Sequence, residues 1–254
     1  MRFASLGSGS AGNALVVQAG TTTLLLDCGF SVSATLRRLQ RLQLDAGTLN
    51  GILVTHEHSD HIGGVAGLAR RFDLPVWMTH GTRRFRPQAF AGVTVHEISP
   101  HQRFSIGDIE VQPCPVPHDA AEPVQYVLGD GARRLGVLTD TGHITPHIEA
   151  TFAGCHALVL ECNHDTEMLR TGRYPPHLKQ RVGGPLGHLN NQQAAEFLAR
   201  LDTACLQHIV AAHLSEHNNT PDLAVRAICD ALSCAKREIA VAAQTTGLDW
   251  RELA

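Results

Sequence analysis

Residues 55–64 read THEHSDHIGG and hold four side chains that can bind metal ions within six positions: His56, His58, Asp60 and His61. The apolar residues 52–54 predict a buried strand before this cluster, and a helix is expected to begin near Asp60. Imidazoles and a carboxylate suit a divalent ion such as Zn²⁺ or Mn²⁺. The cluster predicts half of a two-metal site, and the alternative is a His-rich surface turn.

The composition is that of an ordinary globular protein, with 43% hydrophobic and 18% charged residues among 254. The net charge of -3 provides no global basic field, so a nucleic-acid partner would have to bind through local patches. Seven cysteines without a CxxC pair are expected to be reduced core thiols. No long apolar segment appears, so we expect a cytoplasmic protein without a membrane partner, of unknown oligomeric state.

Alternating and continuous apolar runs predict a mixed α/β chain. Strands are expected at 3–6, 14–17, 22–26, 52–55, 75–78, 93–98, 109–116, 124–129, 134–139, 157–161, 208–212 and 238–242. Helices are expected around 32–42, 61–72, 194–201 and 223–231, with a Pro/Gly-rich loop before the third and a short tail after residue 242. No linker or repeat divides the chain, so residues 1–254 are expected to form one domain.

Single His and Asp residues recur at strand ends further along the chain: His118 in PVPHDA, Asp140 in VLTDTG, His188 in GPLGHLNN and His213 in IVAAHLSEHNN. Strand ends are where α/β sites assemble. Each residue alone is a weak signal, since an isolated His is more often a surface or core residue and an Asp can belong to a turn. Their joint order is the informative feature.

This order, HxHxDH followed by His, Asp and His, resembles the metallo-β-lactamase superfamily along nearly the whole chain. The segments SLGSGSAGNA, LLLDCG, PHDA, TDTG, ECNHD, RYPPHLKQRVGGPLGH and HLSEHNN together resemble its YycJ/WalJ branch, whose members are similar to ribonucleases Z and J. The resemblance implies a four-layer αββα sandwich.

Carried over by position, the resemblance implies two sets of ligands: His56, His58 and His118 for one metal, Asp60, His61 and His213 for the other, and Asp140 bridging both. Such a set leaves each ion a position for a shared water, which fits a catalytic site. Two divalent ions would convert that water to a bridging hydroxide and neutralise the charge of a phosphodiester.

Three residues are candidates for proton transfer and orientation. Asp60 could orient the water or accept its proton. His188, which resembles the His of the ribonuclease Z signature GHxT, is the candidate general acid for the leaving group. Glu161 matches an acidic position of that family and could orient His188. The alternative for His188 is support of the turn into the next helix.

Two segments are candidates for substrate binding. Arg173, Lys179 and Arg181 lie in a basic loop that could contact a phosphate backbone, or could simply be solvated. The turn GSGSAG matches GxGxxG, but strands rather than a helix follow it, so dinucleotide binding is rejected. The resemblance places this turn near the metals, where Ser8 and Asn13 could touch a substrate phosphate; the alternative is a plain hairpin turn.

The function that the sequence favours is a dinuclear metal-dependent phosphodiesterase acting on nucleic acid. DNA is favoured over RNA because the resembled branch is associated with exodeoxyribonuclease activity. One alternative is a thioester hydrolase of the glyoxalase II type, which uses a similar ligand set. Another is a regulatory binding protein without turnover, although every ligand position of the family is filled here.

Overall fold

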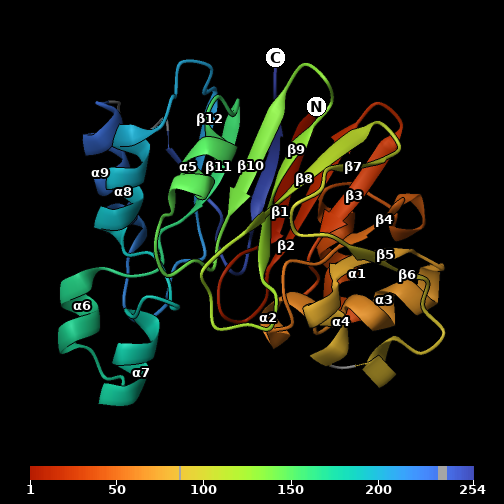
Figure 1. The fold of residues 1–254 in the computed structure, drawn as a ribbon, viewed down its shortest axis with the longest axis horizontal. Coiled ribbons are helices and arrows are strands. Elements are labelled where there is room, and N and C mark those ends of the chain that lie inside the picture. The colour runs from red at the N-terminus through yellow and green to blue at the C-terminus, as the bar shows by residue number, and fades with distance from the viewer. Residues whose placement is uncertain (86, 234–238) are drawn as a thin grey trace.

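The strands form two sheets that pack face to face, with helices on both outer sides (Figure 1). The computed structural model describes residues 1–85, 87–233 and 239–254. The predicted αββα sandwich is confirmed by this arrangement. Among the described helices, none combines the length and the apolar character needed to cross a membrane.

The first sheet contains seven described strands in the order β14-β1-β2-β3-β4-β5-β6. The neighbours β14, β1, β2 and β3 pair antiparallel, whereas β3, β4, β5 and β6 pair parallel. The bounds are β1 Arg2–Gly7, β2 Ala14–Ala19, β3 Thr22–Leu26, β4 Gly51–Leu53, β5 Val76–Thr79, β6 Val95–Ile98 and β14 Leu248–Glu252.

The second sheet follows the same plan, with seven described strands in the order β13-β12-β11-β10-β9-β8-β7. Strands β7 to β10 pair antiparallel, and β10 to β13 pair parallel. The bounds are β7 Phe104–Ile106, β8 Ile109–Pro115, β9 Val124–Gly129, β10 Arg134–Leu138, β11 Ala157–Glu161, β12 His208–Ala212 and β13 Ile239–Val241.

Side-chain alternation along the strands builds three apolar layers. In β3, Leu24 and Leu26 face the second sheet, while Leu25 between them packs against the helices outside the first sheet. In β11, Val159 faces the first sheet, and Leu158 and Leu160 pack against the helices on the other side. Both β3 and β11 are therefore buried on both faces, which explains their continuous apolar sequences.

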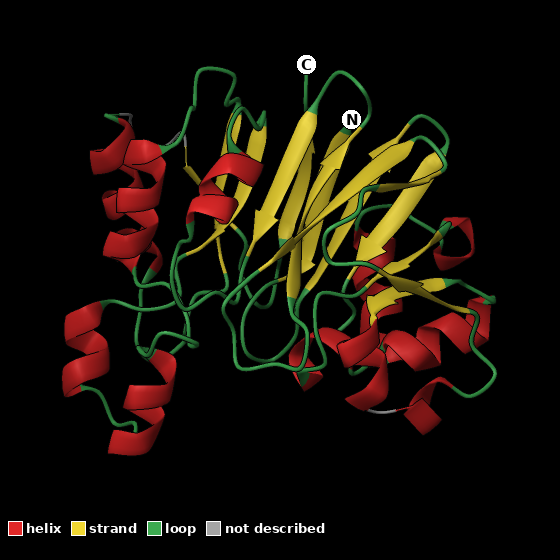
Figure 2. Cartoon of the chain, in the orientation of Figure 1, coloured by secondary structure: helices red, strands yellow, loops and turns green. Residues whose placement is uncertain are grey.

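The helices cover the outer faces and one pair projects from the body. Outside the first sheet lie α1 Val32–Arg41, α2 Ser59–Ile62, α3 Val65–Phe72 and α4 His80–Phe85, with 3₁₀ turns η1 Ala46–Thr48 and η2 Pro87–Phe90. Outside the second sheet lie α5 Pro146–Phe152, α8 Asn191–Arg200 and α9 Pro221–Leu232. The pair α6 Thr166–Thr171 and α7 Pro176–Val182 stands away from both sheets at the lower left of Figure 2.

Most predicted strands are confirmed, but the predicted helix 61–72 is divided into α2 and α3 at Gly63 and Gly64. The amide of Gly64 donates to the carbonyl of Cys28, and a Cβ on Gly64 would lie 1.9 Å from the carbonyl oxygen of Phe30. The break lets the HxHxDH segment pack closely on the loop after β3.

Other predictions are wrong. The short tail contains strand β14, which pairs with β1, and the Pro/Gly-rich loop contains α6 and α7. Strand β7 and helices α4 and α5 were not predicted. Cys205 is exposed rather than a core thiol, whereas the other five described cysteines are buried. Cys234 and the first residue of the predicted strand 238–242 lie outside the described residues.

The site residues collect at one edge of the sandwich because parallel strands end there together. Asp27 follows β3 and His56 follows β4, which are paired neighbours in the first sheet. Asp140 follows β10, Glu161 ends β11 and His213 follows β12, three neighbouring strands of the second sheet. Side chains from both sheets therefore meet at their carboxyl edge.

Candidate metal centre

Three imidazoles converge beyond the end of β4. The Nε2 atom of His56 lies 3.0 Å from Nδ1 of His58, and Nε2 of His118 lies 3.3 Å from the same His58 nitrogen. His56 and His118 are buried, and His58 is partly exposed. These nitrogens lie close enough together to bind one ion.

A second set of ligand atoms lies beside the first. The Oδ2 atom of Asp60 is 3.5 Å from Nε2 of His61 and 3.6 Å from Nε2 of His213. The carboxylate of Asp140 reaches both sets, with Oδ2 3.3 Å from Nε2 of His61 and Oδ1 3.9 Å from Nε2 of His118. The structure thus brings all seven predicted ligands together, with Asp140 between the two sets.

The other ring nitrogen of each imidazole donates to a fixed acceptor. Their acceptors are Thr55 Oγ1 for His56 (2.9 Å), the Asp119 carbonyl for His58 (3.2 Å), Asp27 Oδ2 for His61 (2.8 Å), the Gly187 carbonyl for His118 (3.0 Å) and Glu161 Oε1 for His213 (3.1 Å). These bonds set the orientation of each ring and turn its second nitrogen towards the centre.

The residues present fit divalent cations. The buried atoms Asp140 Oδ2 and His213 Nε2 make no well-formed hydrogen bond to any part of the chain that the structure describes. Buried polar atoms without partners are costly, and the facing nitrogens of the first set would repel one another through their lone pairs. Bound cations would satisfy both groups of atoms, so this donor set suits divalent metal ions.

The carboxylates and imidazoles at the centre shift one another's pKa values. Burial opposes the charged imidazolium of His213, but the carboxylates of Asp140, Asp60 and Glu161 outweigh it and raise the pKa of His213 to about 10. Burial likewise opposes the charged form of Asp140, but His213 and His61 hold the pKa of that carboxyl well below its usual range. Protons held by these imidazoles must leave when a cation binds.

Glu161, at the end of β11, accepts hydrogen bonds from several residues around the centre. It is completely buried and accepts hydrogen bonds from the amides of Asp140, Thr141 and Leu189 and from the rings of His188 and His213. Burial would raise the pKa of Glu161, but the charge of His188 and its hydrogen bond, together with His213, lower that pKa to about 2. Glu161 therefore stays ionised and fixes both imidazoles.

His188 lies at the surface of the centre rather than inside it. Its Nδ1 donates to Glu161 Oε1 over 2.8 Å, which leaves Nε2 as the nitrogen able to serve the cleft. The ring centroid is 5.2 Å from those of both His118 and His213. The side chain is 20% exposed, so a reacting group can reach it.

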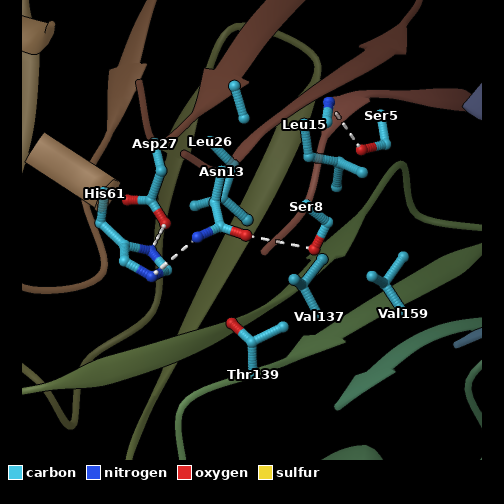
Figure 3. Close-up of a pocket in the computed structure, with 12 residues that line it drawn as sticks. Ser5, Ser8, Asn13, Leu15, Leu26, Asp27, His61, Val137, Thr139 and Val159 are labelled. Atoms are coloured by element: carbon cyan, nitrogen blue, oxygen red, sulfur yellow. Dashed lines mark hydrogen bonds and ion pairs between the residues drawn. The ribbon is translucent and has the colours of Figure 1, made fainter. Parts of the chain in front are cut away.

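Asp27 was missed as a functional residue by the sequence analysis. It is buried, and it accepts hydrogen bonds from the backbone amide and the hydroxyl of Thr55 as well as from His61. Figure 3 shows its carboxylate directed at the His61 ring. The signal available was the sequence LLLDCG, in which an Asp directly follows an apolar strand; Asp140 lies two residues after the end of β10.

Ser8 and Asn13 are both buried and form hydrogen bonds to predicted ligand residues. The Ser8 hydroxyl accepts from the amide of His213, and the Asn13 amide group contacts Asp60. Figure 3 shows the Ser8 hydroxyl donating to Asn13 Oδ1 and the Asn13 amide group contacting His61. Behind them, a cavity of about 30 Å³ between the sheets has room for an ordered water. The substrate contact expected for Ser8 and Asn13 stays a prediction.

A cleft of about 370 Å³ opens over the centre. It is lined by Ser10, His58, Ser59, Asp60, Asp119, Asp140, Tyr174, Leu178, Arg181, Val182, Gly187, His188 and His213. Arg181 lies in this lining and its Nε donates to Asp119 Oδ2 over 2.6 Å. Arg173 and Lys179 do not line the cleft: Arg173 contacts the ring of His217, and Lys179 donates to the carbonyl of Arg170.

Comparisons with known proteins agree with this geometry. The beta-lactamase superfamily domain matches residues 22–213. Exodeoxyribonuclease YycJ of Bacillus anthracis is 40% identical over 91% of this chain and 89% of its own length, and exodeoxyribonuclease WalJ of Streptococcus pneumoniae is 32% identical over 88% and 85%. The metallo-beta-lactamase fold protein YhfI of Bacillus subtilis superimposes with a TM-score of 0.76 over 98% of both chains at 18% identity, which shows a shared fold.

Proposed function

Since this chain belongs to the beta-lactamase superfamily and to its exodeoxyribonuclease YycJ/WalJ branch, and is a metal-dependent hydrolase, we propose that it removes nucleotides from DNA by phosphodiester hydrolysis. The relatives named exodeoxyribonuclease support the choice of DNA over RNA. We also propose that each chain binds two metal ions.

We assign one ion to His56, His58 and His118. The other ion is assigned to Asp60, His61 and His213, and the carboxylate of Asp140 is shared by both ions. Two divalent ions bound there would activate a shared water and neutralise the phosphodiester oxygens. The fixed outer hydrogen bonds of the five imidazoles support this assignment, since they direct the free nitrogens inward.

One observation favours a phosphodiester over a thioester: the ring of His188, held by Glu161, lines the cleft beside the ligands. The alkoxide that leaves a phosphodiester needs a proton, whereas a thiolate does not. His188 Nε2 is placed to donate that proton, and Asp60 to orient the attacking water. Arg181 supplies a positive charge in the same cleft for the phosphate group.

The test is an assay of the purified protein with Zn²⁺ or Mn²⁺ on end-labelled DNA and RNA, beside a glutathione thioester. We expect release of nucleotides from DNA ends. The variant Asp140→Asn can adopt the left-handed backbone of Asp140 (φ 50°), but its neutral side chain binds both ions more weakly. It should therefore cleave DNA at least about 10³-fold more slowly.

The exposed Asp249→Asn serves as a matched control and should keep wild-type turnover. Turnover like that of the wild type in Asp140→Asn would refute the bridging role, and thioester hydrolysis without nucleic-acid cleavage would refute the proposed substrate. We further propose that residues 1–254 act as one domain in the cytoplasm.

A further inference from the structure

The segment that carries α7 has an apolar side that no core explains. No residue of α7 is buried. Yet Tyr174, Leu178 and Val182 recur every four positions, and Leu178 and Val182 lie one turn apart on the same side of the helix. An apolar stripe on a helix normally packs against a core. Here it needs another partner.

The three apolar side chains line the cleft over the metal centre. The same cleft is lined by His58 and Asp60, both predicted ligands, and by His188. The apolar stripe of α7 therefore shares one cleft with the place where the scissile bond would lie. Tyr174 is only partly buried, so its ring is accessible to a bound molecule.

The neighbourhood of this stripe is charged. Arg181, on the same helix, is 60% exposed and is paired with Asp119, the residue that follows His118 in the chain. On the other side, the ring of Tyr174 meets the ring of His217 edge to face, with centroids 6.0 Å apart. The apolar surface of Tyr174, Leu178 and Val182 thus lies beside the Arg181 guanidinium, in the cleft that the predicted metal ligands also line.

We propose that Tyr174 and Leu178 form a nucleobase subsite, on which the base of the nucleotide being removed stacks while its phosphate lies at the metal centre. This inference rests on the proposed function and names how the same cleft recognises its substrate. Bases stack on aromatic side chains with little sequence preference, which suits an enzyme that must remove every nucleotide in turn. The cleft volume of about 370 Å³ lies in the range of small-ligand pockets, which suits a single nucleotide.

The test uses the metal-loaded enzyme and two single-stranded DNA oligonucleotides of equal length. One carries bases throughout, and the other is abasic at the terminal nucleotides of both ends. Wild type, Tyr174→Ala, Tyr174→Phe and His177→Ala are compared by kcat/KM. His177 is the matched control, because it is exposed on α7 and does not line the cleft.

We expect the wild type to prefer the oligonucleotide with terminal bases by about tenfold, and Tyr174→Ala to lose this preference mainly through a higher KM. Tyr174→Phe and His177→Ala should keep it. Equal cleavage of both oligonucleotides by the wild type, or an unchanged preference in Tyr174→Ala, would overturn the subsite while leaving the nuclease function intact. A wild type that cleaves neither oligonucleotide but hydrolyses a thioester would instead overturn the proposed function itself.

Discussion

Substitution of His188 tests proton transfer independently of metal binding. Its Nδ1 is committed to Glu161, and it belongs to neither proposed ligand set. If it is the general acid, His188→Gln should slow cleavage of DNA by about 10²- to 10⁴-fold, the usual contribution of such a group. The metal content, measured by elemental analysis, should remain that of the wild type.

A leaving group that needs no proton provides the control for this prediction. With the p-nitrophenyl ester of a nucleotide as substrate, the phenolate leaves unassisted, so His188→Gln should retain most of the wild-type rate. An equal loss on both substrates would contradict the acid role and would favour the alternative, that His188 only supports the loop before α8.

Asp27 acts through His61 and is a positioning residue. The variant Asp27→Asn keeps a side chain that tolerates the left-handed backbone (φ 60°) but weakens the bond that orients the His61 ring. Loss of such an outer partner typically reduces metal affinity by about 10- to 100-fold. Competition with a chromogenic chelator should show this loss, whereas Asp45→Asn, at the start of η1, should bind metal like the wild type.

The ligands could be predicted from the sequence because each stands near the end of an apolar strand or within the HxHxDH cluster. Asp27 also follows an apolar strand. The sequence around it does not reveal whether its carboxylate would bind an ion directly or accept a hydrogen bond from the outer nitrogen of a ligand imidazole. That distinction depends on which ring nitrogen of His61 faces the centre, and only packing decides it. Arg181 and Lys179 show the same limit, since they are two residues apart on α7 and only Arg181 lines the cleft.

At the scale of elements, strands were predictable where burial on both faces made their sequences continuously apolar, as in β11 and β12. Helices α6 and α7 were not, because they are short, rich in polar residues and nearly free of buried side chains. Strand β14 alternates apolar and charged residues over only five positions, and its partner β1 lies at the other end of the chain. Pairing at that separation is not visible in a local pattern.

The loop between β11 and α6 contains a buried imidazole whose pKa changes on folding. His164 is 2% exposed, and burial lowers its pKa to about 4. In the unfolded chain this imidazole titrates near 6.5. The folded state therefore holds His164 neutral, and the stability present above pH 6.5 is lost as the pH falls towards 4, by at most about 3 kcal/mol.

Replacement of this side chain should remove that part of the acid sensitivity. The free energy of unfolding of His164→Gln, measured by urea denaturation, should fall less than that of the wild type between pH 7 and pH 4. Acid loss of metal affects both proteins and cancels in the difference. Parallel curves for the two proteins would contradict the assignment, and the exposed His101→Gln should follow the wild type.

At the scale of the whole molecule, the centre exists only because two sheets meet. The first sheet contributes His56, His58, Asp60 and His61, and the second contributes Asp140 and His213. His118 follows β8 and reaches the first set from the second sheet. Sequence order alone could not bring these residues together, and the family resemblance supplied the arrangement that the structure displays.

The central claim is that seven side chains hold two divalent ions around a shared position. Anomalous diffraction from crystals grown with Zn²⁺ or Mn²⁺, recorded at the absorption edge of the metal, tests it most directly. We predict two peaks per chain, one among His56, His58 and His118 and one among Asp60, His61 and His213, both in contact with the carboxylate of Asp140. A single peak, or peaks away from Asp140, would contradict the account.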